Sequence, residues 1–436
     1  MLKAFGSAMK TPDLRKKILF TLGIVALYRV GAQVPSPGVL LGNIKQCVQQ
    51  ATAGGQGDIY SLVNLFSGGA LLQLSVFALG IMPYITASII IQLLTVVIPR
   101  FELLKKEGQS GQAKLTQYTR YLTIALGILQ ATGIIALARS GQLFQCDKDI
   151  LANKDSIFQY SLLVLTMTAG TALIMWFGEL ITEKGIGNGM SLLMATSIAA
   201  RIPAEGTSIA SRGQVVLWSM IALSLVVIVT VVFVEQAQRR IPVQYAKKMI
   251  GRKMYGGTST YLPLKVNQAG VIPVIFASSL LYIPQLITQL QGNSEAGPIR
   301  RFFENYVINM SSWVHIVLYL ALIIFFAYFY VAITFNPEER ADEMKRYGGF
   351  IPGIRPGRPT AEYLQYVLSR ITLPGALYLG VVAILPNLLM SLTGPANGQN
   401  FPFGGTAVLI LVGVALETVK QIESQLQQRN YEGFLR

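Results

Sequence analysis

The sequence contains few of the residues that enzymes and metal sites depend on. Among its 436 residues there is one histidine, His315, and there are two cysteines, Cys47 and Cys146. One histidine without clustered cysteines supplies too few ligands for a metal site, and the phosphate-binding pattern G-x-x-x-x-G-K-[ST] is absent from the sequence. We therefore expect no enzyme activity, no metal and no cofactor, so any energy from ATP has to come from a partner.

Charged residues are also scarce. They make up 13% of the chain, whereas hydrophobic residues make up 52%, which is more apolar side chain than a water-soluble core could bury. The first apolar run, residues 18–34, ends in Pro35-Ser36-Pro37 without a small-x-small cleavage site. We interpret it as a first membrane span and not as a cleaved signal. The composition predicts an all-α polytopic membrane protein.

Ten apolar segments are predicted to cross the membrane. They are residues 18–34, 74–98, 118–138, 158–180, 190–200, 214–234, 269–290, 313–335, 372–392 and 404–419. An even number of spans places both termini on one side, and 27 of the 36 Lys and Arg residues lie on that side, against seven on the other. By the positive-inside rule both termini are cytosolic. The remaining two, Arg29 and Arg201, are counted with the spans.

A short motif occurs twice in the chain. Gly80-Ile81-Met82-Pro83-Tyr84-Ile85 is nearly repeated in Gly270-Val271-Ile272-Pro273-Val274-Ile275. A weaker similarity links residues 187–194 to 404–410 and is short enough to be a coincidence. Five spans per half would make the halves enter the membrane from opposite sides, and Gly/Pro-interrupted spans at matching positions of such inverted repeats point to a translocation pathway. We expect Pro83 to kink its span beside that pathway.

Four long stretches resemble the SecY family, the pore subunits of bacterial protein-conducting channels. They are FSGGALLQLSVFALGIMPYITASIIIQLL, MWFGELITEKGIGNGMS, RRIPVQYAKKM with STYLPLKVNQAGVIPVIFASS, and FNPEERADEMKRYGGFIPGIRPGRPTAEYL. The resemblance implies two five-helix halves around a central pore, with a lateral exit between them. It implies a passive channel that moves unfolded secretory proteins across the cytoplasmic membrane of a bacterium and releases transmembrane segments into it. The implied partners are SecE, SecG, the ATPase SecA, the ribosome, signal peptides, nascent chains and membrane lipids.

The resemblance also implies a ring of apolar side chains that constricts the pore. Its members would be Ile81, Ile85, Met190, Met194, Ile275 and Ile410. A narrow apolar collar tends to exclude water and ions, yet it can yield around a passing peptide. Met190 and Met194 depart from the branched residues that are commoner in the family, and methionine is longer and more adaptable. For each residue taken alone, ordinary helix packing is the alternative.

An apolar piece at about residues 58–72 is too short to cross the membrane and is predicted to be re-entrant. It resembles the family's plug, with the members Ile59, Tyr60, Leu62, Val63, Leu65, Phe66, Ser67, Gly68 and Gly69. The two glycines would permit a hinge, and an interfacial loop helix is the alternative. Gln92 and Asn267 match polar positions at the family's lateral gate, although polar packing between spans would also explain them.

Two loops on the side of the termini carry many basic residues. Residues 236–268 hold seven and no acidic one, whereas the basic residues of 336–370 are nearly balanced by acidic ones. Unbalanced positive charge suits phosphate contacts with ribosomal RNA, although the positive-inside signal alone also produces basic loops. The resemblance implies ribosome or SecA docking for Arg239, Arg240, Lys247, Arg252, Lys253 and Arg355.

The segments divide the chain into regions. These are a cytosolic amphipathic segment 1–17, an N-terminal half 18–200, an external loop with the sixth span 201–235, the basic loop 236–268, spans seven and eight 269–335, the docking loop 336–370, spans nine and ten 371–422, and a cytosolic tail 423–436. Both cysteines fall in external loops, where a disulfide or two unpaired thiols are equally compatible with the sequence. Two functions compete with the channel. One is a secondary transporter of small solutes with inverted repeats, and the other is a membrane anchor or RNA-binding scaffold without a pore.

Overall fold

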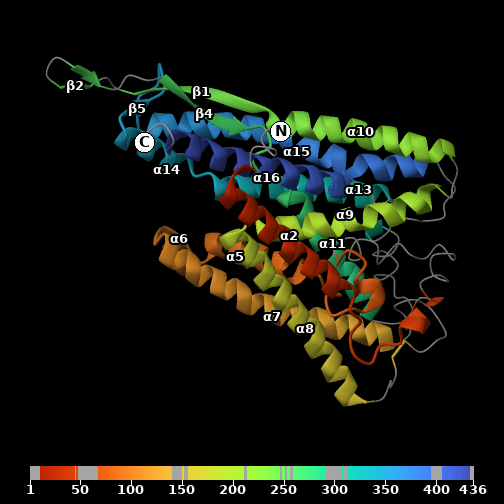
Figure 1. Cartoon of the computed structure of the whole chain (residues 1–436). Coiled ribbons are helices and arrows are strands. Elements are labelled where there is room, and N and C mark those ends of the chain that lie inside the picture. Colours follow the sequence, from red (N-terminus) through yellow and green to blue (C-terminus); the bar gives the residue numbers. More distant parts are fainter. Residues whose placement is uncertain are drawn as a thin grey trace.

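The computed structural model describes residues 10–44, 46–47, 67–139, 150–151, 156–210, 214–245, 248–250, 253–255, 259–290, 306–307, 312–393 and 405–432. Long helices run side by side through most of it (Figure 1). They are α2 (Pro12–Gln33), α5 (Met82–Val97), α7 (Gln109–Arg139), α8 (Ile157–Lys184), α9 (Gly189–Ala210), α10 (Gln214–Gln236), α11 (Ile272–Leu290), α13 (Trp313–Thr334), α15 (Arg358–Thr393) and α16 (Gly405–Glu432). Each segment predicted to cross the membrane coincides with one of these helices over most of its length.

Several of these helices have the dimensions of membrane spans. Within the described residues, the stretches that are both long and apolar enough are Gln109–Arg139, Ile157–Lys184, Trp313–Arg346 and Arg358–Leu385. A fifth would be α5 together with the short helix α6 (Pro99–Lys106), although these two are bent by 100° at their junction. The prediction of a multi-pass membrane protein is confirmed, while the number of ten spans stays a prediction.

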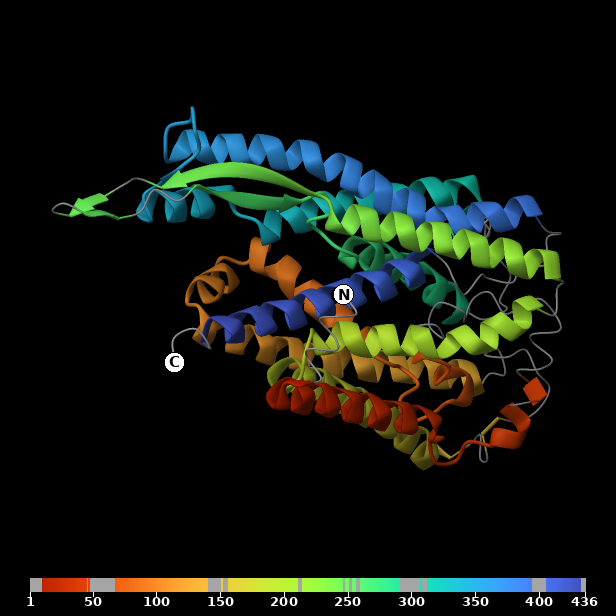
Figure 2. The same ribbon diagram turned by 45° about the horizontal axis from the view of Figure 1, so that its top comes forward.

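Two small β-sheets make the prediction of an all-α fold wrong in part. Strand β1 (Gln238–Tyr245) pairs antiparallel with β4 (Ser259–Lys265), with Gln238 opposite Lys265, and also with the short strand β5 (Gly349–Phe350). Strands β2 (Lys248–Ile250) and β3 (Lys253–Tyr255) form the second sheet. The basic loop is thus a hairpin, and it projects beyond the ends of the helices (Figure 2). The sequence signal for β1 is the alternation of apolar and other residues around Ile241 and Val243, and these two side chains are buried between exposed neighbours.

Pro83 begins a helix and does not kink one. Helix α5 starts at Met82, so Pro83 occupies the first turn, where its missing N–H group has no intrahelical partner in any case. The residues before it form a 3-10 turn at Leu71–Gln73 and a run of turns, and Gly80 has a left-handed φ of 58°. The repeat does the same, since Gly270 has a φ of 62° and Pro273 is the second residue of α11.

Several helices extend further than hydropathy predicted. Helix α7 begins at Gln109 and α15 at Arg358, well before their apolar segments, and α9 continues through Pro203 to Ala210. Polar turns at a helix end stay hydrogen-bonded within the helix, so hydropathy marks only the apolar part of it. The docking loop therefore contains a helix, α14 (Pro337–Arg346), and the start of α15. The predicted tail is helical to Glu432.

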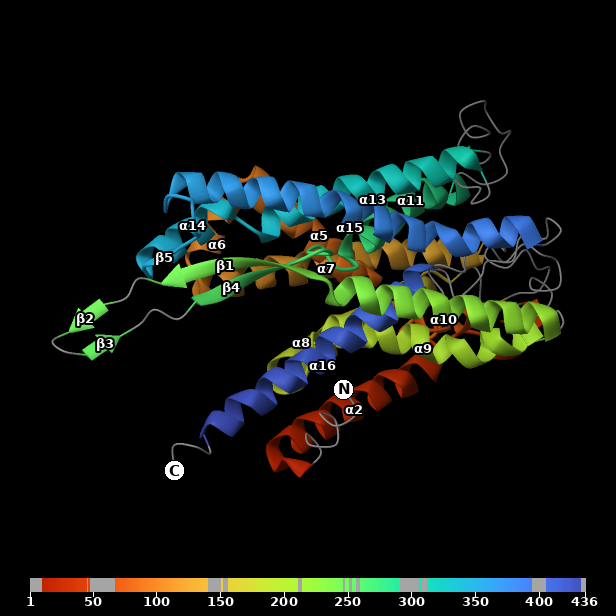
Figure 3. The same cartoon turned by 90° about the horizontal axis from the view of Figure 1, so that it is seen from above.

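The helices fall into an N-terminal and a C-terminal set that meet along two seams. In the first set α2 packs on α8 and α9, and α7 lies between α5 and α8; in the second, α13 lies between α11 and α15. The sets meet where α9 contacts α16 and α10, and where α11 contacts α5 and α7. Figure 3 shows α9, α10 and α16 side by side, with the hairpin at one end of the bundle. A hydrophobic cluster between the seams takes residues from both sets.

Candidate functional site

The six residues predicted to form a pore ring come together in one hydrophobic cluster. Ile81, Met190, Met194, Ile275 and Ile410 are buried in it, and the partly buried Ile85 packs against it. They come from α5 and the residue before it, α9, α11 and α16, so both helix sets contribute. Residues more than 300 positions apart in the chain thus share one hydrophobic cluster. Packing within either half alone would not bring them together.

The internal repeat is visible in the packing of this cluster. Ile81 and Val271 occupy equivalent positions of the repeated motif, as do Ile85 and Ile275, and all four are in or against the cluster. Val271 is not among the predicted ring residues, although the repeat makes it equivalent to Ile81. The weaker repeat behaves in the same way, because α9 contributes Met194 and Ile198 where α16 contributes Ile410 and Val414.

The turn before α9 fixes the start of the helix and thereby the position of Met190 along it. The side-chain oxygen of Asn188 accepts hydrogen bonds from the backbone N–H groups of Met190 (3.1 Å) and Ser191 (3.4 Å), so Asn188 caps the helix. The hydroxyl of Thr182 accepts from the N–H of Gly189 (2.9 Å) and donates to the carbonyl of Gly178 (2.8 Å). The glycine-rich stretch of residues 185–189 thus ends in the cap of α9.

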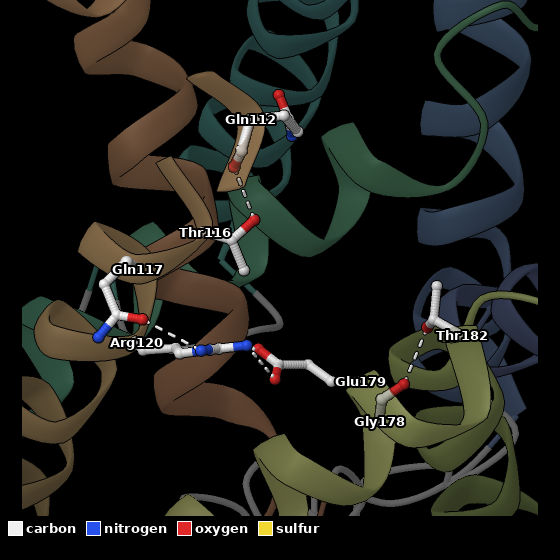
Figure 4. Close-up of polar contacts among 7 residues, drawn as sticks. All are labelled: Gln112, Thr116, Gln117, Arg120, Gly178, Glu179 and Thr182. Carbon is white, nitrogen blue, oxygen red and sulfur yellow. Dashed lines mark hydrogen bonds and ion pairs between the residues drawn. The ribbon is translucent and has the colours of Figure 1, made fainter. Parts of the chain in front are cut away.

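An ion pair supports the helix behind Met190. Arg120 of α7 points toward Glu179 of α8 and donates two hydrogen bonds to its carboxylate, at 2.9 and 2.7 Å, and a third to Gln117 at 3.0 Å (Figure 4). Glu179 therefore links α8 to α7. The preceding residue, Gly178, faces Met190 so closely that a Cβ there would lie 2.7 Å from the Met190 Cε atom.

Comparison with known proteins agrees with this arrangement. The SecY family model matches residues 75–419. The chain belongs to the SecY family. It is 69% identical over 442 residues to the protein translocase subunit SecY of Mycobacterium tuberculosis and 64% identical over 443 residues to that of Streptomyces coelicolor, with the whole of each chain covered.

Solved structures share the fold at much lower identity. A structure described as a protein-conducting channel has a TM-score of 0.61 at 18% identity and covers 94% of this chain and 91% of that one. Sec61 in the canine ribosome-channel complex has a TM-score of 0.58 at 16% identity, with 94% and 91% covered. At such identities the likeness shows that the SecY fold is shared.

Most of the predicted plug of this SecY family member lies outside the described residues, including Ile59, Tyr60, Leu62, Val63, Leu65 and Phe66. Of the remainder, Ser67 is fully buried and accepts a hydrogen bond from the N–H of Leu71 at 3.2 Å. Gly68 and Gly69 have left-handed φ angles of 65° and 93°. Gly68 also lies against the backbone of Ser197, so it serves close packing as well as conformational freedom.

The two predicted gate residues differ in their surroundings. Asn267 is buried, and its amide donates hydrogen bonds to the carboxylate of Glu235 (2.5 Å) and to the carbonyl of Gly270 (3.1 Å). It therefore ties the turn before α11 to α10. Gln92 is exposed on α5, and its backbone carbonyl accepts from Thr95 at 2.6 Å. A shared role at a lateral gate stays a prediction for both.

The predicted docking residues are exposed where the structure describes their side chains. Arg239 and Arg240 lie on β1, and the Arg240 guanidinium stands 4.9 Å above the ring centre of Tyr261 on β4. Arg355 is exposed in the turn between β5 and α15, where Thr360 donates to its carbonyl at 2.8 Å. Lys253 lies on β3, and Lys247 and Arg252 lie outside the described residues.

The remaining candidates concern metals and cysteines. In the part of the chain that the structure describes, no group of three His, Cys, Asp or Glu side chains could hold a metal ion. Cys47 is buried and disulfide-bonded. Cys146, the other cysteine of the sequence, lies outside the described residues.

Proposed function

We propose that this chain is the pore-forming subunit of a protein-conducting channel in the cytoplasmic membrane of a bacterium. It passes unfolded secretory proteins across the membrane and releases transmembrane segments laterally into it. The observation that carries the proposal is the meeting of Ile81, Met194, Ile275 and Ile410 from both helix sets in one apolar cluster, in a chain of the SecY family.

The cluster can act as a seal that makes no specific bonds. Aliphatic side chains offer no hydrogen bonds to water, so a narrow apolar collar favours the dry state and blocks ions. They offer none to a peptide either, so an extended chain of any sequence can pass once the helices separate. Met190 and Met194 add side chains with three rotatable bonds, which adapt to different passing residues.

The architecture follows the family. Ten spans form two inverted halves, with both termini in the cytosol, and residues 58–72 form a plug on the external side of the ring. The seam where α11 meets α5 and α7 serves as the lateral exit, with Gln92 and Asn267 at its polar positions. SecE and SecG are the small membrane subunits of the complex.

Energy and direction come from cytosolic partners. The sequence lacks a phosphate-binding loop, so SecA or the translating ribosome drives the chain. The hairpin with Arg239 and Arg240 and the turn with Arg355 are connected through one sheet, because β1 pairs with both β4 and β5 and the turn follows β5. We assign this surface to docking of the ribosome and SecA, with phosphate contacts that weaken as salt rises. Signal peptides and nascent chains then enter between the halves.

A transporter of small solutes fits the structure less well. Such proteins bind their substrates and coupling ions with ionisable or strongly polar groups at mid-membrane. Among the described residues, the buried polar side chains are those of Ser, Thr, Asn and Tyr, and none is charged, while Arg29 and Arg201 are only partly buried.

The test compares ring and non-ring substitutions in proteoliposomes that contain the chain with SecE and SecG. Ile410→Ala should raise the ion leak and keep SecA- and ATP-dependent translocation of a signal-bearing substrate. The matched control is Ile135→Ala, a change at an equally buried isoleucine of a different cluster. Both variants lose about 2–5 kcal/mol of stability, but only the ring variant should leak.

Two outcomes would contradict the proposal. Equal leak from both variants would show that general loosening, and not the ring, opens the path. Solute uptake without any protein translocation by the wild type would favour the transporter.

A further inference from the structure

Two arginines occupy helices that are predicted to lie in the membrane. Arg29 is near the C-terminal end of α2, and Arg201 lies in the second half of α9. Both side chains are partly buried. A guanidinium is costly within a membrane and keeps its charge at any physiological pH, so such residues face partners or an aqueous path and commonly have a functional role.

The two side chains converge on one dipeptide. The Nη1 atom of Arg29 donates to the carbonyl of Gly68 at 3.4 Å. A Cβ on Gly69 would lie 3.7 Å from the Nη1 atom of Arg201. The segment Ser67–Gly69 is therefore contacted by one guanidinium from α2 and one from α9, on two adjacent glycines with left-handed backbones.

The two helices that carry these arginines, α2 and α9, are held together close to the arginine positions. Tyr28, next to Arg29, shares a buried hydrogen bond of 2.6 Å between its hydroxyl and that of Ser197. The Tyr28 ring stacks on Phe77 with 5.8 Å between ring centres. A Cβ on Gly68 would lie 3.1 Å from the Ser197 Cα atom. The two guanidinium groups thus extend from a rigid wall.

This wall continues the lining of the ring. On α9 the residues Met190, Met194, Ser197 and Arg201 follow one another by four, three and four residues, which places all of them on one helical face. At 1.5 Å per residue, Arg201 stands about 10 Å beyond Met194 along the helix. In the orientation proposed above, that is the external side of the ring.

We propose that Arg29 and Arg201 determine how the pathway responds to charge. At rest they hold the Gly68–Gly69 backbone against the wall. Beyond the ring they present two fixed positive charges to the translocating chain, so that stretches of lysine or arginine are slowed and acidic stretches are not. This inference rests on the proposed function, because it concerns the same pathway.

The experiment measures SecA-driven translocation into proteoliposomes of two substrates that differ only in a block of lysines or a block of glutamates. The wild type should move the lysine substrate more slowly. The double variant Arg29→Gln/Arg201→Gln should raise the lysine-to-glutamate rate ratio by about threefold or more, because the repulsion between like charges is removed. Arg29→Lys/Arg201→Lys should keep the wild-type ratio, since both charges remain.

The controls separate charge at this site from net charge and from folding. Arg139→Gln removes an exposed positive charge at the end of α7 and should leave the ratio unchanged. If the double glutamine variant does not fold in detergent, the single variants Arg29→Gln and Arg201→Gln take its place, and each should shift the ratio part of the way.

The inference is overturned if the glutamine variants translocate both substrates with the wild-type ratio, or if Arg139→Gln shifts the ratio as far as they do. Those outcomes leave the proposed function standing. A wild type that translocates neither substrate overturns both.

Discussion

Gly178 of α8 offers the sharpest test of how the ring is held. We predict that Gly178→Ala moves Met190 and makes the closed channel leak. The added Cβ would lie 2.7 Å from Met190 Cε and 3.3 Å from Cγ, and closest of all to the sulfur atom. Carbon atoms in contact prefer about 3.5–4.0 Å, so the end of the Met190 side chain has to move by about 1 Å.

The energetic cost follows from what has to move. Overpacking a core by one methyl costs about 1–3 kcal/mol, and alanine regains about 1 kcal/mol of helix propensity over glycine. The net loss of stability should therefore be small, about 0–2 kcal/mol, because methionine is flexible. Gly170→Ala should cost more, since its Cβ would meet the backbone carbonyl of Val76, which cannot rotate away. Gly133→Ala, with nothing within 4 Å of its Cβ, should be neutral or stabilising.

The assay combines thermal unfolding of the purified complex in detergent with ion flux through proteoliposomes. Gly178→Ala should leak while keeping nearly wild-type stability. Adding Met190→Ala removes the side chain that meets the new Cβ, so the double variant should pack without the clash, with a coupling energy of about 1 kcal/mol in the double-mutant cycle. The reasoning is refuted if Gly178→Ala seals like the wild type, or if the two changes are additive in stability.

Three further predictions concern the frame around the ring. Glu179→Gln should lower the free energy of unfolding by about 1 kcal/mol, which is less than for a buried pair because Arg120 is 41% exposed. The variant should melt at a lower temperature than the wild type, and an unchanged melting temperature would mean that solvent screens the pair. Asn188→Ala should lose about 1 kcal/mol by uncapping α9, whereas Asn188→Asp should not; equal melting temperatures for the two variants would argue against the cap. Tyr28→Phe should cost about 0.5–1.5 kcal/mol through its lost bond to Ser197, and an unchanged urea midpoint would contradict this.

The meeting of the six ring candidates in one cluster could be expected because the family resemblance named them, and the repeat independently marked two of the segments that carry them. Gly80 and Pro83 mark the start of a helix beside a break, and the same pattern at Gly270 and Pro273 marks a second one. Apolar residues at fixed offsets from those marks then meet in the fold. The family resemblance named the same positions, and the repeat adds Val271, which the resemblance alone did not supply.

The parts that were not predicted depend on contacts between distant residues. No pattern near Glu179 reveals that its partner is Arg120, because the two are 59 residues apart and meet only once α7 and α8 pack. Gly178 is one of many helical glycines in the sequence, and its importance arises from the approach of Met190. The hairpin was not predicted because the apolar alternation at Ile241 and Val243 is short and stands among basic residues that are also typical of a loop.

Helix α15 is 36 residues long, or about 54 Å at 1.5 Å per residue, which exceeds the roughly 30 Å of a hydrocarbon core. Its polar first turns therefore extend beyond the apolar part of the helix, directly after the turn that carries Arg355, and that turn follows β5, which pairs with β1 of the hairpin. The sheet is therefore joined by a single turn to a helix that packs against both α13 and α16.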